Sequence, residues 1–250
     1  MRVCLVCGSF PPRQCGVGDY TWHLAGALAQ AGIGVYVVTS RGLRGLPERP
    51  AGVMVLDGVD RWDFGALRSI VATVKGLQPQ VVHIQYQTAL YGMHPALNLL
   101  PLSLRRRKRG NFKVVTTFHD LRVPYLFPKA GPLRGLANRA LMAGSDGVIL
   151  TNDEDAIQVT GGASPAGRYA RIPIGSNVQR VVPAGYSRED WRRQHGIAGA
   201  DYVVAYFGFL NDSKGVDTLF RAVARLRESL PVRLLLVGGG VGQADPTNAA

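Results

Sequence analysis

Three stretches of this 250-residue chain carry groups that suit the binding of a phosphate-bearing substrate. A glycine-rich stretch at residues 8–19 ends in Gly-Val-Gly-Asp, where Gly16 and Gly18 let a ligand approach the backbone closely. His119 ends the run Thr-Thr-Phe-His; such a histidine can bond to a substrate hydroxyl or a phosphate, and can change charge near neutrality. Lys214 comes just before a stretch with helical spacing, so its cation and the amides of a helix N-terminus would converge on a diphosphate.

Each stretch has a plainer alternative that the sequence leaves open. The glycines can form an ordinary surface connection, His119 can be a surface residue paired with Asp120, and Lys214 can be a solvated lysine in a turn. A nicotinamide dinucleotide site is poorly supported, because Thr21 stands where the third glycine of that fingerprint belongs. A Gly-Lys-Ser/Thr phosphate-binding loop is also missing from the sequence.

The histidines and cysteines predict neither a metal site nor a cofactor. No pair of histidines has metal-ligand spacing with a third partner. His83 lies within an apolar run and is expected to be a hydrogen-bonded core histidine. Cys4 and Cys7 are three positions apart in an expected strand, so we expect two buried thiols that point to opposite faces.

The elements that must position these residues follow a repeated strand-then-helix order, which predicts an α/β fold with a parallel sheet covered on both faces. Ligands of such a sheet bind beyond the carboxyl ends of its strands, where residues 8–19 and His119 would lie. Gly32 follows the first expected helix at the position of a C-terminal cap. The expected strands are residues 2–8, 35–39, 53–56, 81–85, 113–118, 147–151 and 169–174, and the expected helices are 20–31, 64–74 and 152–160.

A break in this order divides the chain. Residues 1–174 are expected to form an N-terminal, acceptor-side domain, and residues 175–186 an aperiodic linker rich in turn-forming residues. The order restarts at residues 187–250 with strands at 202–208 and 232–237. Two strands cannot easily bury both faces of a sheet, so this part either packs entirely on the first part or is the start of a longer C-terminal domain, and we favour the latter. The helix between them, at 215–230, should point Val216, Leu219, Phe220, Val223 and Leu230 inward.

The net charge of +12 is concentrated at residues 95–145, which hold ten Lys or Arg against one acid. Leu97, Leu100 and Leu104 recur there at helical spacing, which suits a helix lying on an anionic membrane surface; a buried helix with a solvated basic end is the alternative. Nucleic acid is not expected as a partner, because stacking aromatics are not interleaved with the basic residues. The densest basic run is Arg105, Arg106, Arg107, Lys108 and Arg109.

The composition predicts a soluble protein. With 46% hydrophobic residues the chain can form a core, and no window reaches the roughly 18 uninterrupted apolar residues of a membrane span. The N-terminal apolar run is too short for the core of a signal peptide. We therefore expect a cytoplasmic protein, peripheral on the inner face of the membrane where the basic run binds lipid.

Taken together, six segments in order resemble the retaining glycosyltransferases of the GT-B fold, in the large family-four group. The resemblance implies two Rossmann-like domains that face each other across a cleft. It also implies transfer of a sugar, with retention and without a metal, from a nucleotide-diphosphate donor to a hydroxyl of a glycolipid or cell-surface polysaccharide intermediate. The segments are the Gly-Val-Gly-Asp stretch and residues 83–87, 117–120, 172–178, 214–219 and 235–240.

The resemblance implies roles for several residues. Gly16 and Gly18 would offer amides to the donor diphosphate, His119 would contact the transferred sugar, and Lys214 would neutralise the leaving diphosphate. Further substrate-binding residues are implied at Asp19, Gln85, Tyr86, Gly208 and Asn211.

Two departures from the family pattern affect these expectations. Phe209 stands where the family has an arginine, so the diphosphate would be bound by Lys214, by Arg13 or by backbone amides alone. The family's pair of glutamates lies beyond a strand such as 235–240, and no glutamate follows Gly240. We therefore expect a C-terminally incomplete and inactive chain, with a non-catalytic phosphate- or membrane-surface-binding module as the alternative.

Overall fold

The computed structural model divides the chain into two compact units, Met1–Asn177 and Val178–Ala250. The division falls inside the stretch expected to be a linker. The residues described by the structure are 1–42, 50–105, 112–121, 131–163, 166–178, 181–208, 210 and 214–238. Within these ranges, none of the helices has the length and apolar character that crossing a bilayer would require.

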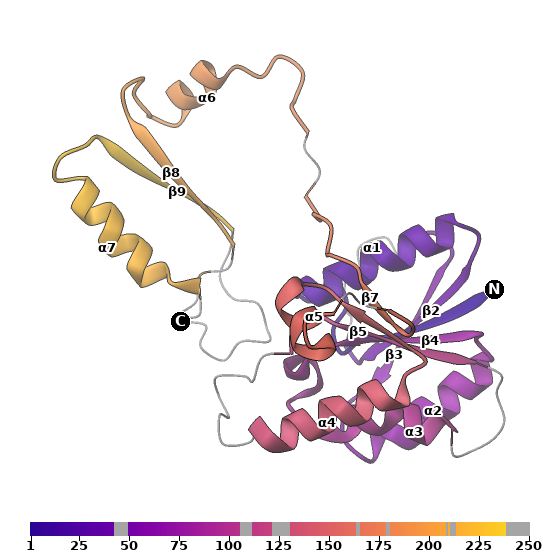
Figure 1. Cartoon of the computed structure of the whole chain (residues 1–250). Coiled ribbons are helices and arrows are strands. Elements are labelled where there is room, and N and C mark those ends of the chain that lie inside the picture. Colours follow the sequence, from indigo (N-terminus) through magenta and orange to yellow (C-terminus); the bar gives the residue numbers. More distant parts are fainter. Residues whose placement is uncertain are drawn as a thin grey trace. The chain divides into compact units, whose positions relative to one another are not determined.

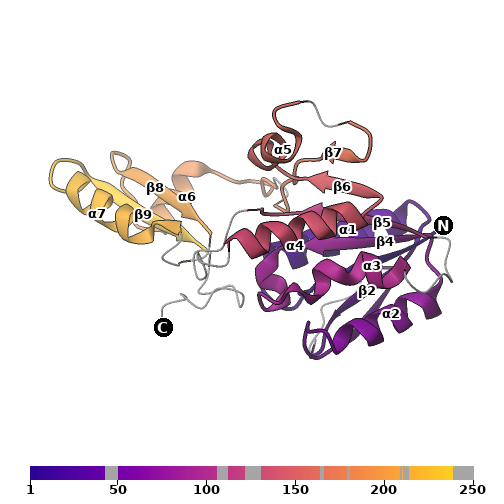
Figure 2. The same cartoon turned by 60° about the horizontal axis from the view of Figure 1, so that its bottom comes forward.

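The first unit is built on a seven-stranded parallel sheet, as predicted, with the order β3-β2-β1-β4-β5-β6-β7 (Figures 1 and 2). The chain runs outward from β1 to β3 and then returns to place β4 on the other side of β1. The strand order therefore reverses between β1 and β4, which is where parallel sheets of this kind bind ligands. The strands are β1 (Arg2–Val6), β2 (Gly34–Ser40), β3 (Val53–Val59), β4 (Val81–Tyr86), β5 (Lys113–Phe118), β6 (Gly147–Leu150) and β7 (Tyr169–Arg171).

Helices cover both faces of this sheet, as predicted (Figures 1 and 2). Alternate residues of β1 serve the two faces: Val3 and Leu5 pack under α1, whereas Cys4 and Val6 belong to the core under α2, α3 and α4. The helices are α1 (Gly16–Gln30), α2 (Ala66–Leu77), α3 (Leu100–Arg105), α4 (Gly131–Gly144) and α5 (Asp153–Thr160), with 3₁₀ turns η1 (Thr88–Tyr91) and η2 (Pro95–Leu99).

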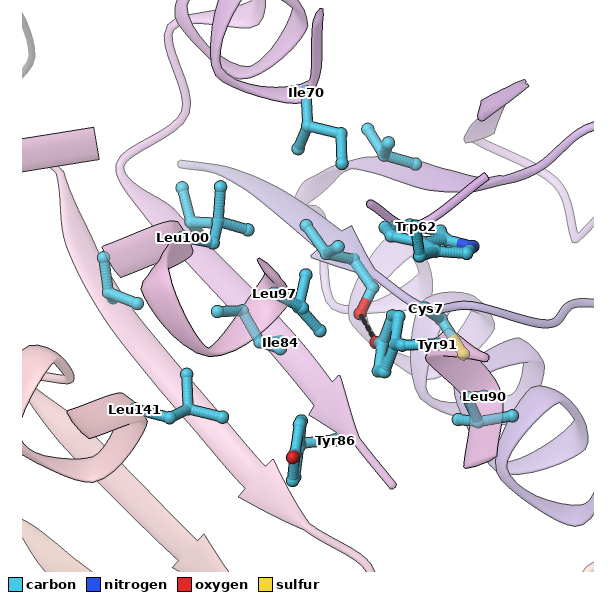
Figure 3. Close-up of a cluster of buried hydrophobic side chains, with 14 of the residues drawn as sticks. Cys7, Trp62, Ile70, Ile84, Tyr86, Leu90, Tyr91, Leu97, Leu100 and Leu141 are labelled. Carbon is cyan, nitrogen blue, oxygen red and sulfur yellow. Dashed lines mark hydrogen bonds between the residues drawn. The ribbon is translucent and has the colours of Figure 1, made fainter. Parts of the chain in front are cut away.

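The larger of the two cores buries the leucine stripe. Leu97, Leu100 and Leu104 are at most 2% exposed, and Figure 3 shows Leu97 and Leu100 beside Ile84 of β4. These leucines cannot also enter a membrane, so the alternative of a buried helix is confirmed for the three leucines, whereas the basic residues 106–109 lie outside the described residues. Cys7 packs in the same core as Cys4 rather than on the opposite face, because β1 ends at Val6 and the alternation stops there.

Helix α4 was not among the helices expected from the sequence. Its leucines at 133 and 136 are 73% and 64% exposed, whereas Asn138 is buried and Leu141 is fully buried. A helix that exposes leucine and buries asparagine has a weak apolar period, so its spacing did not indicate a helix.

The second unit is a smaller strand–helix–strand arrangement. It consists of α6 (Arg188–Gln194), β8 (Tyr202–Phe207), α7 (Val216–Leu226) and β9 (Val232–Val237), with β8 and β9 paired in parallel. Val216 and Val223 are buried. Phe220 is 43% exposed, but it lines a groove together with Val223, Val232 and Leu234, so it faces β9 as expected; Leu230 is 41% exposed. The exposed residues follow from the two-stranded sheet, which offers α7 little apolar surface.

Candidate functional site

The N-terminus of α1 lies at the carboxyl end of β1. The helix begins at Gly16, four residues earlier than its apolar spacing indicates, so Gly16 and Gly18 are in its first turn rather than in a loop. Cys15 precedes the helix and makes no side-chain cap hydrogen bond. Because the first N–H groups of a helix have no partner within the helix, this end can receive an anion.

The two glycines of this turn have different reasons to be glycine. A Cβ on Gly18 would lie 3.2 Å from the carbonyl oxygen of Ser9, so Gly18 allows the preceding loop to pack against the helix. A Cβ on Gly16 would meet nothing within 4 Å. Only Gly16 therefore faces open space, as a backbone site for a ligand needs. Asp19 is half-buried, and burial raises the pKa of its carboxyl group while His23 lowers it.

His119 follows directly after β5 and is held on three sides. Its backbone N–H donates to the carbonyl of Tyr86 (3.0 Å), and its Nε2 bonds to Gln85 Oε1 (2.9 Å). The ring of Tyr20 from α1 meets the imidazole edge-on at 4.9 Å. The alternative of a surface histidine paired with Asp120 is therefore wrong. Tyr20 was not expected at this site, because the helix that carries it begins a full turn earlier than its apolar spacing indicates.

Burial, together with a smaller electrostatic contribution from His83, lowers the pKa of His119 to about 4. The expectation that His119 changes charge near neutrality is thus wrong, because the ring is neutral there and acts as a hydrogen-bonding group. Its Nδ1 is buried and has no hydrogen-bond partner among the described residues. The same is true of Gln85 Nε2. The site thus holds one acceptor and one donor that the described residues do not satisfy.

His83 is a hydrogen-bonded histidine of the sheet, as predicted. It is half-buried on β4, and its Nε2 lies 2.8 Å from Thr117 Oγ1 on β5. Burial lowers its pKa to about 4.

Gln85 and Tyr86 lie on opposite faces of β4. Gln85 is fully buried next to His119, whereas the ring of Tyr86 packs in the larger core, where its hydroxyl accepts from Asn98 Nδ2 at 3.0 Å (Figure 3). The structure thus brings Gln85 to His119 and takes the Tyr86 side chain away from it. The Tyr86 phenol is buried in that core and therefore faces away from a substrate at His119.

The second unit carries the remaining predicted residues. Lys214 is exposed and precedes Gly215, which caps α7 in a left-handed conformation (φ 70°) without a side-chain cap bond. Gly208 follows β8 with φ 146°, and its N–H donates to Val237 at 3.1 Å. A Cβ on Gly238 would lie 2.1 Å from the carbonyl oxygen of Gly208, so the ends of β8 and β9 touch. Asn211 and Phe209 lie outside the described residues.

Most of the basic run also lies outside the described residues, namely 106–109. Arg105 is described, and its guanidinium lies 3.2 Å from Asp146. Arg13, the alternative phosphate ligand, donates to the backbone carbonyl of Arg41.

A groove of about 590 Å³ runs between α4 and α5 in the first unit. Arg134, Arg139 and Arg168 line it, and no carboxylate does so among the described residues. Arg134 Nε and Nη1 are buried there without a hydrogen-bond partner in the described part of the chain. Such a site can bind an anion, because these two buried nitrogens carry a desolvation cost that an anionic acceptor would offset.

No metal centre is evident in the ranges that the structure describes, where no three His, Cys, Asp or Glu side chains gather.

Comparisons with known proteins fit this geometry. Residues 15–175 match the family described as "Glycosyl transferase 4-like domain". The protein EpsD of Bacillus subtilis (strain 168) is 31% identical over 150 residues, which cover 57% of this chain and 38% of EpsD. The GDP-mannose-dependent alpha-(1-6)-phosphatidylinositol monomannoside mannosyltransferase of Mycolicibacterium smegmatis is 25% identical over 241 residues, covering 94% of this chain and 60% of the relative.

Solved structures show the same fold. Sucrose-phosphate synthase from Thermosynechococcus elongatus superposes with a TM-score of 0.69 at 23% identity, covering all of this chain and 64% of that chain. The fold is therefore the parallel-sheet, Rossmann-like α/β fold of GT-B structures. The chain spans between about two fifths and three fifths of the length of the curated relatives named above.

Proposed function

Because this chain belongs to the family of glycosyl transferase 4-like domains, we propose that it serves the transfer of a sugar from a nucleotide-diphosphate donor to a hydroxyl acceptor. The observation that carries this proposal is the contact of Tyr20 with His119. It places the uncapped N-terminus of α1 beside a neutral histidine at the carboxyl edge of one sheet. The GDP-mannose dependence of the mycobacterial relative supports a donor of this class.

His119 binds a substrate hydroxyl in this proposal, and it does not act as a cation. Its pKa of about 4 leaves the ring neutral at physiological pH, so it offers a lone pair and an N–H rather than a charge. The negative charge of the leaving diphosphate is instead balanced by the exposed ammonium of Lys214 and by helix amides. Fixed donors of this kind stabilise charge that grows in the transition state.

The transfer forms a bond from the acceptor oxygen to the anomeric carbon and breaks the bond from that carbon to the diphosphate, and the proton of the acceptor hydroxyl passes to the leaving diphosphate oxygen. We propose retention of configuration, with both events on one face of the sugar. For this reason we assign no protein nucleophile. We also propose that Lys214 and the amides, rather than a metal, balance the charge of the diphosphate.

An anionic acceptor fits the first unit best. The groove between α4 and α5 offers three arginines and no carboxylate among its described lining residues. The acceptor in the mycobacterial relative's name, phosphatidylinositol monomannoside, is a phosphate-bearing lipid. We therefore propose a lipid-linked or glycan acceptor that carries a phosphate, and a peripheral position on the inner face of the membrane that uses the basic run beginning at Arg105.

The test is acceptor-dependent release of nucleoside diphosphate from a panel of nucleotide sugars, with a phospholipid extract as acceptor. It uses this chain and, where the reading frame extends beyond Ala250, the complete product. His119→Ala and Lys214→Ala should each lower kcat by roughly a hundredfold. The controls His195→Ala and Arg221→Ala remove an exposed histidine and an exposed cation of the second unit, and should leave kcat unchanged.

Full activity in both His119→Ala and Lys214→Ala would contradict the assigned roles. Lipid binding without transfer by the complete product would favour the non-catalytic module instead.

A further inference from the structure

Four polar side chains form a ladder across β4 and β5 on the face that α1 covers. His83 bonds to Thr117 at 2.8 Å, and Gln85 bonds to His119 at 2.9 Å. The strands are parallel and in register, with Gln85 opposite Thr117, so each bond runs diagonally to a residue two positions further along. The same spacing thus repeats, and His119 is the last member of the ladder.

Gln85 is a rigid partner for His119. It is fully buried on β4, a strand with neighbours on both sides in the sheet. The backbone of His119 is fixed by its bond to Tyr86, and the imidazole ring is limited by Tyr20. The side chain of Gln85 therefore sets which hydrogen bond the imidazole can make.

The bond from Gln85 selects one form of the imidazole. An amide oxygen can only accept a hydrogen bond, so Oε1 of Gln85 requires that Nε2 of His119 carries the hydrogen. A neutral imidazole has one N–H, so Nδ1 then holds a lone pair. That atom is buried and has no partner among the described residues, which costs free energy unless a ligand supplies a donor.

We propose that Gln85 is a positioning residue, which holds His119 with the hydrogen on Nε2 so that Nδ1 can accept a hydrogen bond from a substrate hydroxyl. This inference rests on the proposed transferase function for the identity of the substrate, but not for the state of the ring. The groups that face the imidazole are His83 from β4 and Tyr20 from α1. Neither carries a charge at neutral pH.

The experiment is nitrogen-detected NMR of the histidine rings in the ¹⁵N-histidine-labelled chain, with His119→Asn to assign the signals. Ring nitrogen shifts distinguish a protonated from an unprotonated nitrogen, and the measurement needs no substrate. At neutral pH we expect His119 to show Nε2 protonated and Nδ1 unprotonated. Thr117→Val is the matched control, because it breaks the bond to His83 and leaves the Gln85 bond, so the His119 signals should keep this pattern.

Two variants of Gln85 separate positioning from packing. Gln85→Leu removes the acceptor and should let the two neutral forms mix. Gln85→Glu keeps an acceptor at the same place, so it should restore the single form and raise the pKa of His119 by about 1 to 3 units through an opposite charge in contact. Where Gln85→Leu fails to fold, Gln85→Glu alone decides, because a pKa that stays at about 4 contradicts the contact.

Nδ1 protonated in the native chain, or an unchanged His119 pattern in Gln85→Leu, would overturn the proposal. The activity assay gives a second readout. Gln85→Leu should lower kcat more than it changes KM. Gln85→Glu should recover kcat only at a pH above the raised pKa of His119, where the imidazole is neutral. Absence of transfer by the parent protein itself, with the NMR pattern as expected, would count against the transferase function and leave the ring assignment standing.

Discussion

Acidification should weaken the first unit because two histidines of its sheet are held neutral. His83 and His119 each have a pKa lowered from 6.5 to about 4, in both cases mainly by burial. Between pH 6.5 and about pH 4, each imidazole is protonated in the unfolded chain and neutral in the folded chain. The free energy of unfolding is therefore highest above pH 6.5, falls as the pH drops towards about 4, and changes no further on this account below it.

The size of the effect follows from the two pKa values. At about pH 5 the unfolded imidazole is almost fully protonated and the folded one is mostly neutral, which costs about 2 kcal/mol for each histidine and about 4 kcal/mol for both. The carboxyl groups of Asp19 and Asp155 act in the opposite direction, because burial raises their pKa in the folded state. The contribution of the histidines is therefore best isolated by comparing the pH dependence of the free energy of unfolding between the parent and a histidine variant.

The assay is urea unfolding at about pH 7.5 and about pH 5 in a Trp191→Phe background, so that fluorescence comes from Trp22 and Trp62 of the first unit. His83→Gln should lose about 2 kcal/mol less than the parent between these pH values. His195→Gln removes an exposed histidine of the second unit and should match the parent. Equal losses in His83→Gln and in the parent would refute the reasoning.

Two further outcomes are expected. Gly8→Ala should lower the free energy of unfolding, measured by urea unfolding, by about 3 kcal/mol or more, because its Cβ would lie 2.1 Å from the carbonyl oxygen of Leu90. Gly16→Ala should be as stable as the parent and weaken only nucleotide binding. Equal stability of the two variants would contradict the packing at Gly8. Arg134→Met should raise Tm by a few degrees in ligand-free protein, because it removes two buried guanidinium nitrogens, Nε and Nη1, that have no hydrogen-bond partner among the described residues; a lower Tm would contradict this.

The sheet could be predicted because its strands are short, apolar and evenly spaced. In the run at 81–86, successive side chains point to opposite faces of the sheet. The run is apolar enough to indicate a strand even though it contains His83 and Gln85. Helix α6 could not be predicted in this way, since none of its residues is buried and its sequence carries no apolar period. The early start of α1 was missed because Gly16 and Gly18 are poor helix formers.

The site was harder to predict than the fold because it depends on register. His119 could be placed at the end of a strand, but its partner Gln85 is 34 residues away in the sequence. The contact exists because β4 and β5 align Gln85 with Thr117, which nothing local in the sequence determines. The same strand pairing buries His119, and this burial lowers the pKa of its imidazole. The charge change expected near neutral pH was therefore wrong because it also depends on the register of β4 and β5.

The reversal of strand order between β1 and β4 also bears on how the protein is made. Val3 pairs with Val81, so β1 stays open on that edge until 78 more residues have been synthesised. Non-local pairing of this kind slows folding and exposes an unpaired edge. The nascent N-terminal half should therefore depend on chaperones most strongly before β4 emerges, and pausing of translation in that interval should increase aggregation more than pausing after β5.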